Sequence, residues 1–133
     1  EYSKKIFKNN VTKIICISSI CGVESIDGAP IGYSIAKSAL NFYIKLISKE
    51  LANKNITING IVPGNIIFKG STWDLKIKKN YIKTKMYIKN NVPINNFGTP
   101  NDIFEVCKMI SENRSKFITG SLFKIDGGQT KGF

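Results

Sequence analysis

The stretch "KIICISS", residues 13–19, is an uninterrupted apolar run that ends in two serines. A strand with one face in water would alternate apolar and polar residues, so this run indicates a parallel strand buried on both faces. A helix is expected next, from residue 33 to about 53, where apolar side chains such as Ala36, Leu40 and Ile47 recur at helical spacing. Strand followed by helix is the first part of a parallel α/β unit.

The rest of the chain continues the alternation. "ITINGIV", residues 56–62, predicts a second strand, and "SLFKIDGG", residues 121–128, predicts a third. Between them, residues 99–102 combine a hydroxyl cap, a proline and an acid, which indicates the start of a helix. Residues 65–92 are rich in lysine and are compatible with one or two short helices. The sequence therefore predicts an α/β fold with about three parallel strands and flanking helices.

The composition narrows the class of protein. The chain has 133 residues, 42% of them apolar, which suits one globular domain. Its net charge of +11 comes almost entirely from scattered lysines, with Arg114 the sole arginine, and this argues against nucleic-acid recognition. Three cysteines without any histidine predict no metal site. No apolar run approaches the roughly 20 residues of a membrane span, so a soluble, cytoplasmic protein is expected.

Two Tyr-x-x-x-Lys pairs occur, Tyr33 with Lys37 in "YSIAK" and Tyr81 with Lys85 in "YIKTK". With 5 tyrosines and so many lysines, about one such pair is expected by chance. Tyr33 lies between the two predicted strands, whereas Tyr81 lies in the lysine-rich segment. Spacing of four on a helix brings an ammonium group near the phenol, where it stabilises the phenolate. Tyr33 is therefore the candidate general acid or base.

Five segments in this order resemble the C-terminal half of a classical short-chain dehydrogenase/reductase, and the match covers essentially the whole chain. They are "ISSICG", "YSIAKSAL", "NGIVPGNI", "FGTPNDI" and "ITGSLFKIDGG". The resemblance implies a partial Rossmann-type doubly wound parallel sheet. It also implies an NAD(P)-dependent oxidoreductase that interconverts an alcohol and a carbonyl by hydride transfer.

The resemblance assigns roles to particular residues. The implied catalytic residues are Ser19, Tyr33 and Lys37, with Ser18 as the alternative serine. The implied cofactor-binding residues are Tyr33, Lys37, Pro63, Gly64, Asn65 and Ile66. A threonine that the family often places two residues after Ile66, against the cofactor, is here Phe68.

The family's glycine-rich turn, its cofactor selector and its catalytic asparagine would all precede Glu1. We therefore expect residues 1–133 to form one partial domain, the C-terminal catalytic half, with the N-terminal dinucleotide-binding half absent. NAD and NADP remain equally open. The resemblance further implies a homodimer or homotetramer of the full-length protein that packs through the helix from residue 33 to about 53.

Two further alternatives remain open. The chain could be a catalytically silent truncated remnant, or an oligomerisation module unable to bind cofactor. In the segment from Phe68 to about Val92, on which the substrate depends, Trp73, Tyr81 and Tyr87 could line a pocket or pack beneath a lid.

Overall fold

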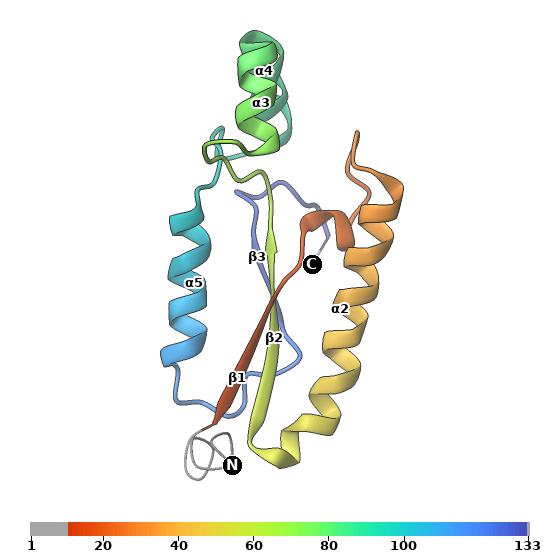
Figure 1. The fold of residues 1–133 in the computed structure, drawn as a ribbon, viewed down its shortest axis with the longest axis vertical. Helices are drawn as coiled ribbons and strands as arrows, with labels where there is room; N and C mark the ends of the chain where they lie inside the picture. The colour runs from red at the N-terminus through yellow and green to blue at the C-terminus, as the bar shows by residue number, and fades with distance from the viewer. Residues whose placement is uncertain (1–10, 133) are drawn as a thin grey trace.

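The computed structural model describes residues 11–132, and within them a three-stranded parallel sheet lies between two helices. The strands are β1 (Thr12–Ile17), β2 (Ile56–Pro63) and β3 (Leu122–Ile125), in the spatial order β1-β2-β3. Helix α2 (Ile31–Leu51) covers one face of the sheet and α5 (Pro100–Glu112) covers the other (Figure 1). The predicted α/β fold with parallel strands is confirmed. The first ten residues, whose sequence is compatible with the tail of a helix, lie outside the described residues.

The central strand is the buried one. Ile61 and Val62 of β2 are both 0% exposed, and Ile44 of α2 packs beside them with the same value. Gly60 makes this close packing possible, because an added Cβ would lie 2.9 Å from Cδ1 of Ile44. Asn59 ties β2 to the segment before β3 by donating to the Ile118 carbonyl at 3.0 Å. The core is therefore built around β2.

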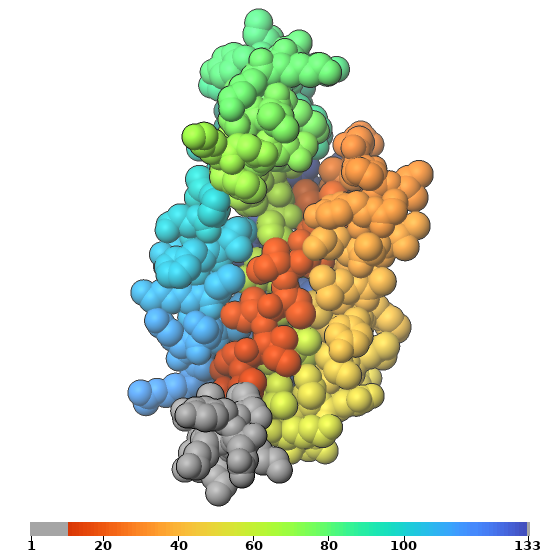
Figure 2. Space-filling view, viewed as in Figure 1, coloured from red at the N-terminus to blue at the C-terminus, as the bar shows by residue number. Residues whose placement is uncertain are grey.

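The strand expected within residues 13–19 is confirmed, but among the described residues it is not buried on both faces. The strand ends at Ile17, and within residues 11–132 it pairs only with β2. Ile14 is 37% exposed and Ile17 is 47% exposed. Figure 2 shows β1, in red, open at the surface between α5 and α2. The reason is physical: β1 lies at the edge of the sheet, and α2 packs mainly on β2, so one face of β1 is poorly covered.

A short turn, η1 (Ile20–Gly22), joins β1 to the loop before α2. An added Cβ at Gly22 would lie 2.6 Å from the backbone carbonyl carbon of Lys37, so only glycine allows this approach. The Gly22 carbonyl accepts hydrogen bonds from Ser38 Oγ at 2.9 Å and Asn41 Nδ2 at 3.0 Å. These contacts hold the first turns of α2 against the end of β1.

Residues 72–91 form a helical hairpin that stands beyond the carboxyl ends of the strands (Figure 1). Its helices are α3 (Thr72–Lys79) and α4 (Tyr81–Asn91), capped by the side chains of Ser71 and Asn80. The lysine-rich segment thus contains two short helices. The predicted start of α5 is also confirmed, because Thr99 and Asp102 form a capping box there. None of the described helices is long and apolar enough to cross a membrane.

Candidate active site

A cleft of about 990 Å³ opens at the carboxyl ends of β1 and β2, below the α3–α4 hairpin. Its wall includes η1, the start of α2, the turn after β2 and the near end of the hairpin. Ligands of parallel α/β sheets bind at this end of the strands. Every site residue expected from the sequence lines this one cleft: Ser19, Tyr33, Lys37, Pro63, Gly64, Asn65 and Ile66.

Tyr33 and Lys37 lie in the first two turns of α2. The Lys37 ammonium is 5.6 Å from the centre of the Tyr33 ring. Its Nζ also donates a 2.9 Å hydrogen bond to the carbonyl oxygen of Ile17, the last residue of β1. Tyr33 remains 45% exposed, so its phenol is accessible from the cleft. The pair can therefore present a proton donor beside a fixed cation.

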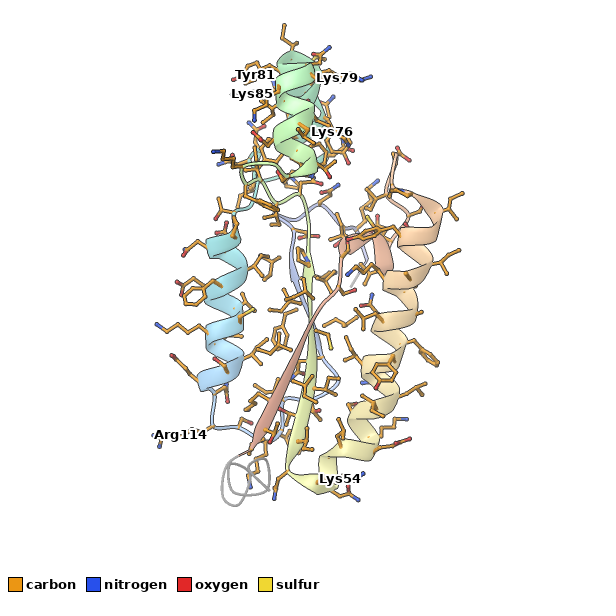
Figure 3. The ribbon with its side chains drawn as sticks, viewed as in Figure 1. Lys54, Lys76, Lys79, Tyr81, Lys85 and Arg114 are labelled. Carbon is orange, nitrogen blue, oxygen red and sulfur yellow. The ribbon has the colours of Figure 1, made fainter. Side chains whose placement is uncertain are left out.

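Tyr81 and Lys85 have the same local geometry, with 5.5 Å between the ammonium and the ring centre. They lie on α4, away from the sheet, as Figure 3 shows, and neither residue lines the cleft. Spacing on a helix therefore produces the same cation–ring contact at both sites. The difference between the two pairs lies in their positions within the fold.

Ser18 and Ser19 both line the cleft and are both buried, at 3% and 7% exposure. Ser18 Oγ donates a long, 3.5 Å hydrogen bond to the backbone carbonyl of Lys37. Ser19 Oγ accepts from the backbone N–H of Cys21 at 3.2 Å. Because an accepting hydroxyl keeps its own hydrogen, Ser19 can still donate to a ligand. The hydrogen-bond pattern favours Ser19 over Ser18 as a donor.

The turn that follows β2 is held rigidly on two sides. Gly64 donates its backbone N–H to the Ile125 carbonyl at 2.9 Å, and an added Cβ at Gly64 would meet the Asp126 backbone at 2.8 Å. Asn65 Nδ2 donates to Gln129 Oε1 at 2.6 Å. Ile66 pairs with Gly98 in an isolated parallel bridge. The backbone of this turn is therefore fixed where it borders the cleft.

Asp126 packs against this turn at Gly64. Partial burial acts to raise the pKa of Asp126, but hydrogen bonds from Thr130 and Gly128 and the charge of Lys124 outweigh it, and the pKa is lowered. Both the hydroxyl and the backbone N–H of Thr130 donate to Oδ2, at 2.6 and 2.9 Å. The ionised carboxylate thus holds the segment after β3 against Gly64.

The aromatic residues of the hairpin behave in two ways. Trp73 packs on Tyr87, with ring centres 5.2 Å apart, and on Phe97 at 5.4 Å. Trp73 and Tyr87 also line the cleft, so they serve both as packing and as wall. Tyr81 does not line it. Phe68, in place of the threonine that the resemblance implied, is 55% exposed and borders the same space.

Several polar residues at the site were not anticipated from the sequence, among them Lys76 in the cleft wall and Gln129 beside it. Lys76 lines the cleft from α3, and its spacing of three from Trp73 could have indicated a shared helix face. Gln129 contacts Asn65 across 64 positions of sequence, and no local signal predicts that contact. The described residues contain no group of three or more side chains able to hold a metal ion.

The parallel sheet with flanking helices is a partial Rossmann-type fold, and comparison with known proteins identifies its family. The family model described as enoyl-(acyl carrier protein) reductase matches residues 1–130. The 3-oxoacyl-[acyl-carrier-protein] reductase FabG of Rickettsia felis is 30% identical over 128 residues, which are 96% of this chain and 50% of that protein. The chain belongs to the short-chain dehydrogenase/reductase family.

Solved structures share the fold. A 4-hydroxyisoleucine dehydrogenase complexed with NADH has a TM-score of 0.77 and 28% identity, covering 99% of this chain and 52% of that one. An NADPH-bound short-chain oxidoreductase from Pseudomonas aeruginosa, described as having an atypical catalytic center, has a TM-score of 0.84. Its identity is 17%, with 99% of this chain and 51% of that chain covered, so it shows the fold alone. The chain spans about half the length of the curated relatives it matches.

Proposed function

We propose that residues 1–133 are the C-terminal catalytic half of a cytoplasmic NAD(P)-dependent oxidoreductase that interconverts an alcohol and a carbonyl. One observation carries the proposal: Ser19, Tyr33 and Lys37 converge on one cleft at the carboxyl edge of the parallel sheet. A hydroxyl donor, a phenol and a cation are the groups needed to polarise a carbonyl and move a proton to it. Membership of the family supports the same activity.

The residues of the cleft fit the nicotinamide end of NAD or NADP. The fixed backbone from Pro63 to Ile66 borders the cleft where the nicotinamide would lie, and Lys37 would hold the ribose hydroxyls. The 4-hydroxyisoleucine dehydrogenase that is described as complexed with NADH supports this assignment. Either cofactor, when bound, supplies or accepts the hydride. Phe68 removes one hydroxyl contact of the kind that a threonine would make.

The proposed division of labour follows from the geometry. Ser19 donates to the carbonyl oxygen of the substrate, because its hydroxyl hydrogen is not used by Cys21. Tyr33 gives its proton to that oxygen during reduction and takes it back during oxidation. Lys37 stabilises the phenolate that remains, from its position beside the ring. Its hydrogen bond to Ile17 keeps the ammonium in place through the cycle.

A purified full-length protein tests the proposal. About ten ketones and 3-oxo thioesters are screened as substrates by following the absorbance of NADPH or NADH at about 340 nm. Oxidation of the cofactor is expected with at least one of them. The reaction should require Tyr33. A protein that folds and binds either dinucleotide but reduces no carbonyl would favour a catalytically silent remnant. A protein that binds neither would favour an oligomerisation module without a cofactor site.

The partner that we propose for the full-length protein is a second copy of itself, in a homodimer or homotetramer. The outer side of α2 is apolar yet exposed, with Ile35 at 64%, Phe42 at 66% and Leu46 at 50%. Such a helix stripe is normally covered, and symmetric pairing covers it at both copies. Phe42→Glu is expected to lower the mass measured by light scattering. A full-length protein that is already monomeric at micromolar concentration would contradict the pairing.

A further inference from the structure

A second cation besides Lys37 borders the cleft. Lys76, on α3, lines the cleft, and its ammonium lies 4.3 Å from the centre of the Trp73 ring. Trp73 is itself held between Tyr87 and Phe97. A cation over a tryptophan face is attracted to it, so the lysine side chain has a preferred position on a rigid support. Figure 3 shows Lys76 nearer to the sheet than Lys79 and Tyr81.

Lys76 has no charged partner among residues 11–132. The ion pair described there joins Lys78 to Asp74 at 2.8 Å, and Asp74 also accepts from the Gly70 backbone. Asp27 is the one carboxylate of the cleft wall within the same residues, and it forms no ion pair with Lys76. Lys37, the other lysine of the wall, is engaged by the Ile17 carbonyl. Lys76 is therefore the available cation of the cleft.

Neighbouring lysines add to the positive electrostatic potential around Lys76. Residues 65–98 contain seven lysines and a single acid, Asp74, in a chain whose net charge is +11. The positive potential of the chain is thus concentrated on the hairpin that borders the cleft. A charged wall of this kind attracts ligands of opposite sign and raises their local concentration.

We propose that Lys76 is a specificity-determining residue that binds an anionic group, a carboxylate or a phosphate, on the substrate. This inference rests on the proposed function of the cleft. The anion would bind at the Lys76 ammonium while the carbonyl of the same molecule faces Ser19 and Tyr33. Substrate discrimination by charge then depends on one side chain held on Trp73.

Direct binding tests the inference without requiring turnover. Trp73 is the one tryptophan of these 133 residues, and its emission reports ligands beside Lys76. The full-length protein is titrated with two matched pairs, acetoacetate against ethyl acetoacetate and dihydroxyacetone phosphate against dihydroxyacetone. The same titrations of the Trp73→Phe variant measure the fluorescence change that comes from any other tryptophan of the longer protein, and this change is subtracted. The pair that shows a charge preference identifies the carboxylate or the phosphate as the recognised group.

The expected result is a preference of about tenfold for one anion over its neutral partner, as for a hydrogen bond to a charged group. In Lys76→Met the ratio of the two dissociation constants should fall to about one, whereas Lys79→Met, on the same helix but outside the cleft, should keep it. A preference retained in Lys76→Met, or no binding by either anion, would overturn the inference.

Two further outcomes separate the causes of failure. If Lys76→Met weakens NADH or NADPH binding and leaves the anion preference intact, Lys76 serves the cofactor phosphates and the inference is wrong. If an anion binds through Lys76 but no carbonyl is reduced, the anion site stands and the proposed oxidoreductase function fails. The binding and turnover measurements therefore test the two proposals independently.

Discussion

Lys37 Nζ donates a 2.9 Å hydrogen bond to the carbonyl oxygen of Ile17, which joins the first turns of α2 to the last residue of β1. This contact spans 20 positions of sequence and positions the ammonium 5.6 Å from the Tyr33 ring centre. The equivalent pair on α4, Tyr81 and Lys85, has the ring contact but no such tie to a strand in the described residues. The site is thus distinguished by its connection to the sheet.

Replacement of Tyr33 by phenylalanine removes the proposed proton donor while keeping the ring. In the full-length protein, Tyr33→Phe should lower kcat by about 10²–10⁴-fold, the range typical of a lost general acid. Cofactor affinity should change little. Tyr81→Phe is the matched control, and it should stay near the wild-type rate. Equal losses of turnover in the two variants would refute the assignment of Tyr33.

Replacement of Gly22 by alanine tests the packing that positions Lys37. The new methyl group would lie 2.6 Å from the Lys37 carbonyl carbon and 2.8 Å from Asn41 Nδ2, so α2 must move. We expect a loss of about 1–3 kcal/mol in the free energy of unfolding, together with slower turnover. Chemical denaturation of the full-length protein measures the first effect.

Gly32→Ala is the control for that experiment, because an added Cβ there meets no atom within 4 Å. Gly32 lies in α2, where alanine is favoured over glycine by about 0.5–1 kcal/mol. This variant should be as stable as the wild type or slightly more so. A Gly22→Ala protein as stable as Gly32→Ala would mean that α2 does not pack tightly on η1.

Asp126 should make stability depend on pH in the acid range. Its pKa is lowered in the folded protein, so the folded state favours the carboxylate, and this stability is lost as pH falls through the folded pKa. Asp126→Asn should cost about 1 kcal/mol at pH 7, allowing for solvent screening of a partly exposed group. The difference from wild type should shrink below about pH 4, where carboxyl groups become protonated.

Thermal melting of both proteins between neutral and acid pH measures this effect. Asp27→Asn is the control, since Asp27 is exposed and makes no hydrogen bond within residues 11–132. A constant difference between Asp126→Asn and wild type across the acid range would contradict the role of the ionised carboxylate.

The chain of 133 residues, expressed alone, should be poorly soluble or molten and should bind no NAD(P). Its β1 edge is open and carries Ile14 and Ile17, and α2 leaves large apolar side chains in water. Each uncovered Å² of such surface costs about 25 cal/mol, and open strand edges promote aggregation. Calorimetry with NADH and NADPH checks this. A cooperative melt together with tight cofactor binding would show that the chain is self-sufficient.

Local patterns were sufficient for much of the fold and for the candidate catalytic pair. The apolar runs at β1 and β2 predicted two strands, because β-branched residues suit a pleated, buried surface. Thr99 and Asp102 predicted the start of α5, because capping depends on residues only three positions apart. The order of these elements around Tyr33 also separated it from Tyr81.

The tertiary structure decided what depends on distant neighbours. The amino-acid pattern of β1 suits burial on both faces, yet Ile17 is 47% exposed because burial depends on which elements lie beside a strand. Likewise, Asn65 contacts Gln129 only because the sheet order brings the C-terminal segment to the edge where β2 ends. For the same reason, the hairpin lies at that edge and Lys76 borders the cleft. Hydrogen-bonding and packing preferences act over a few residues and can be read from sequence, whereas exposure and long-range contacts are properties of the assembled chain.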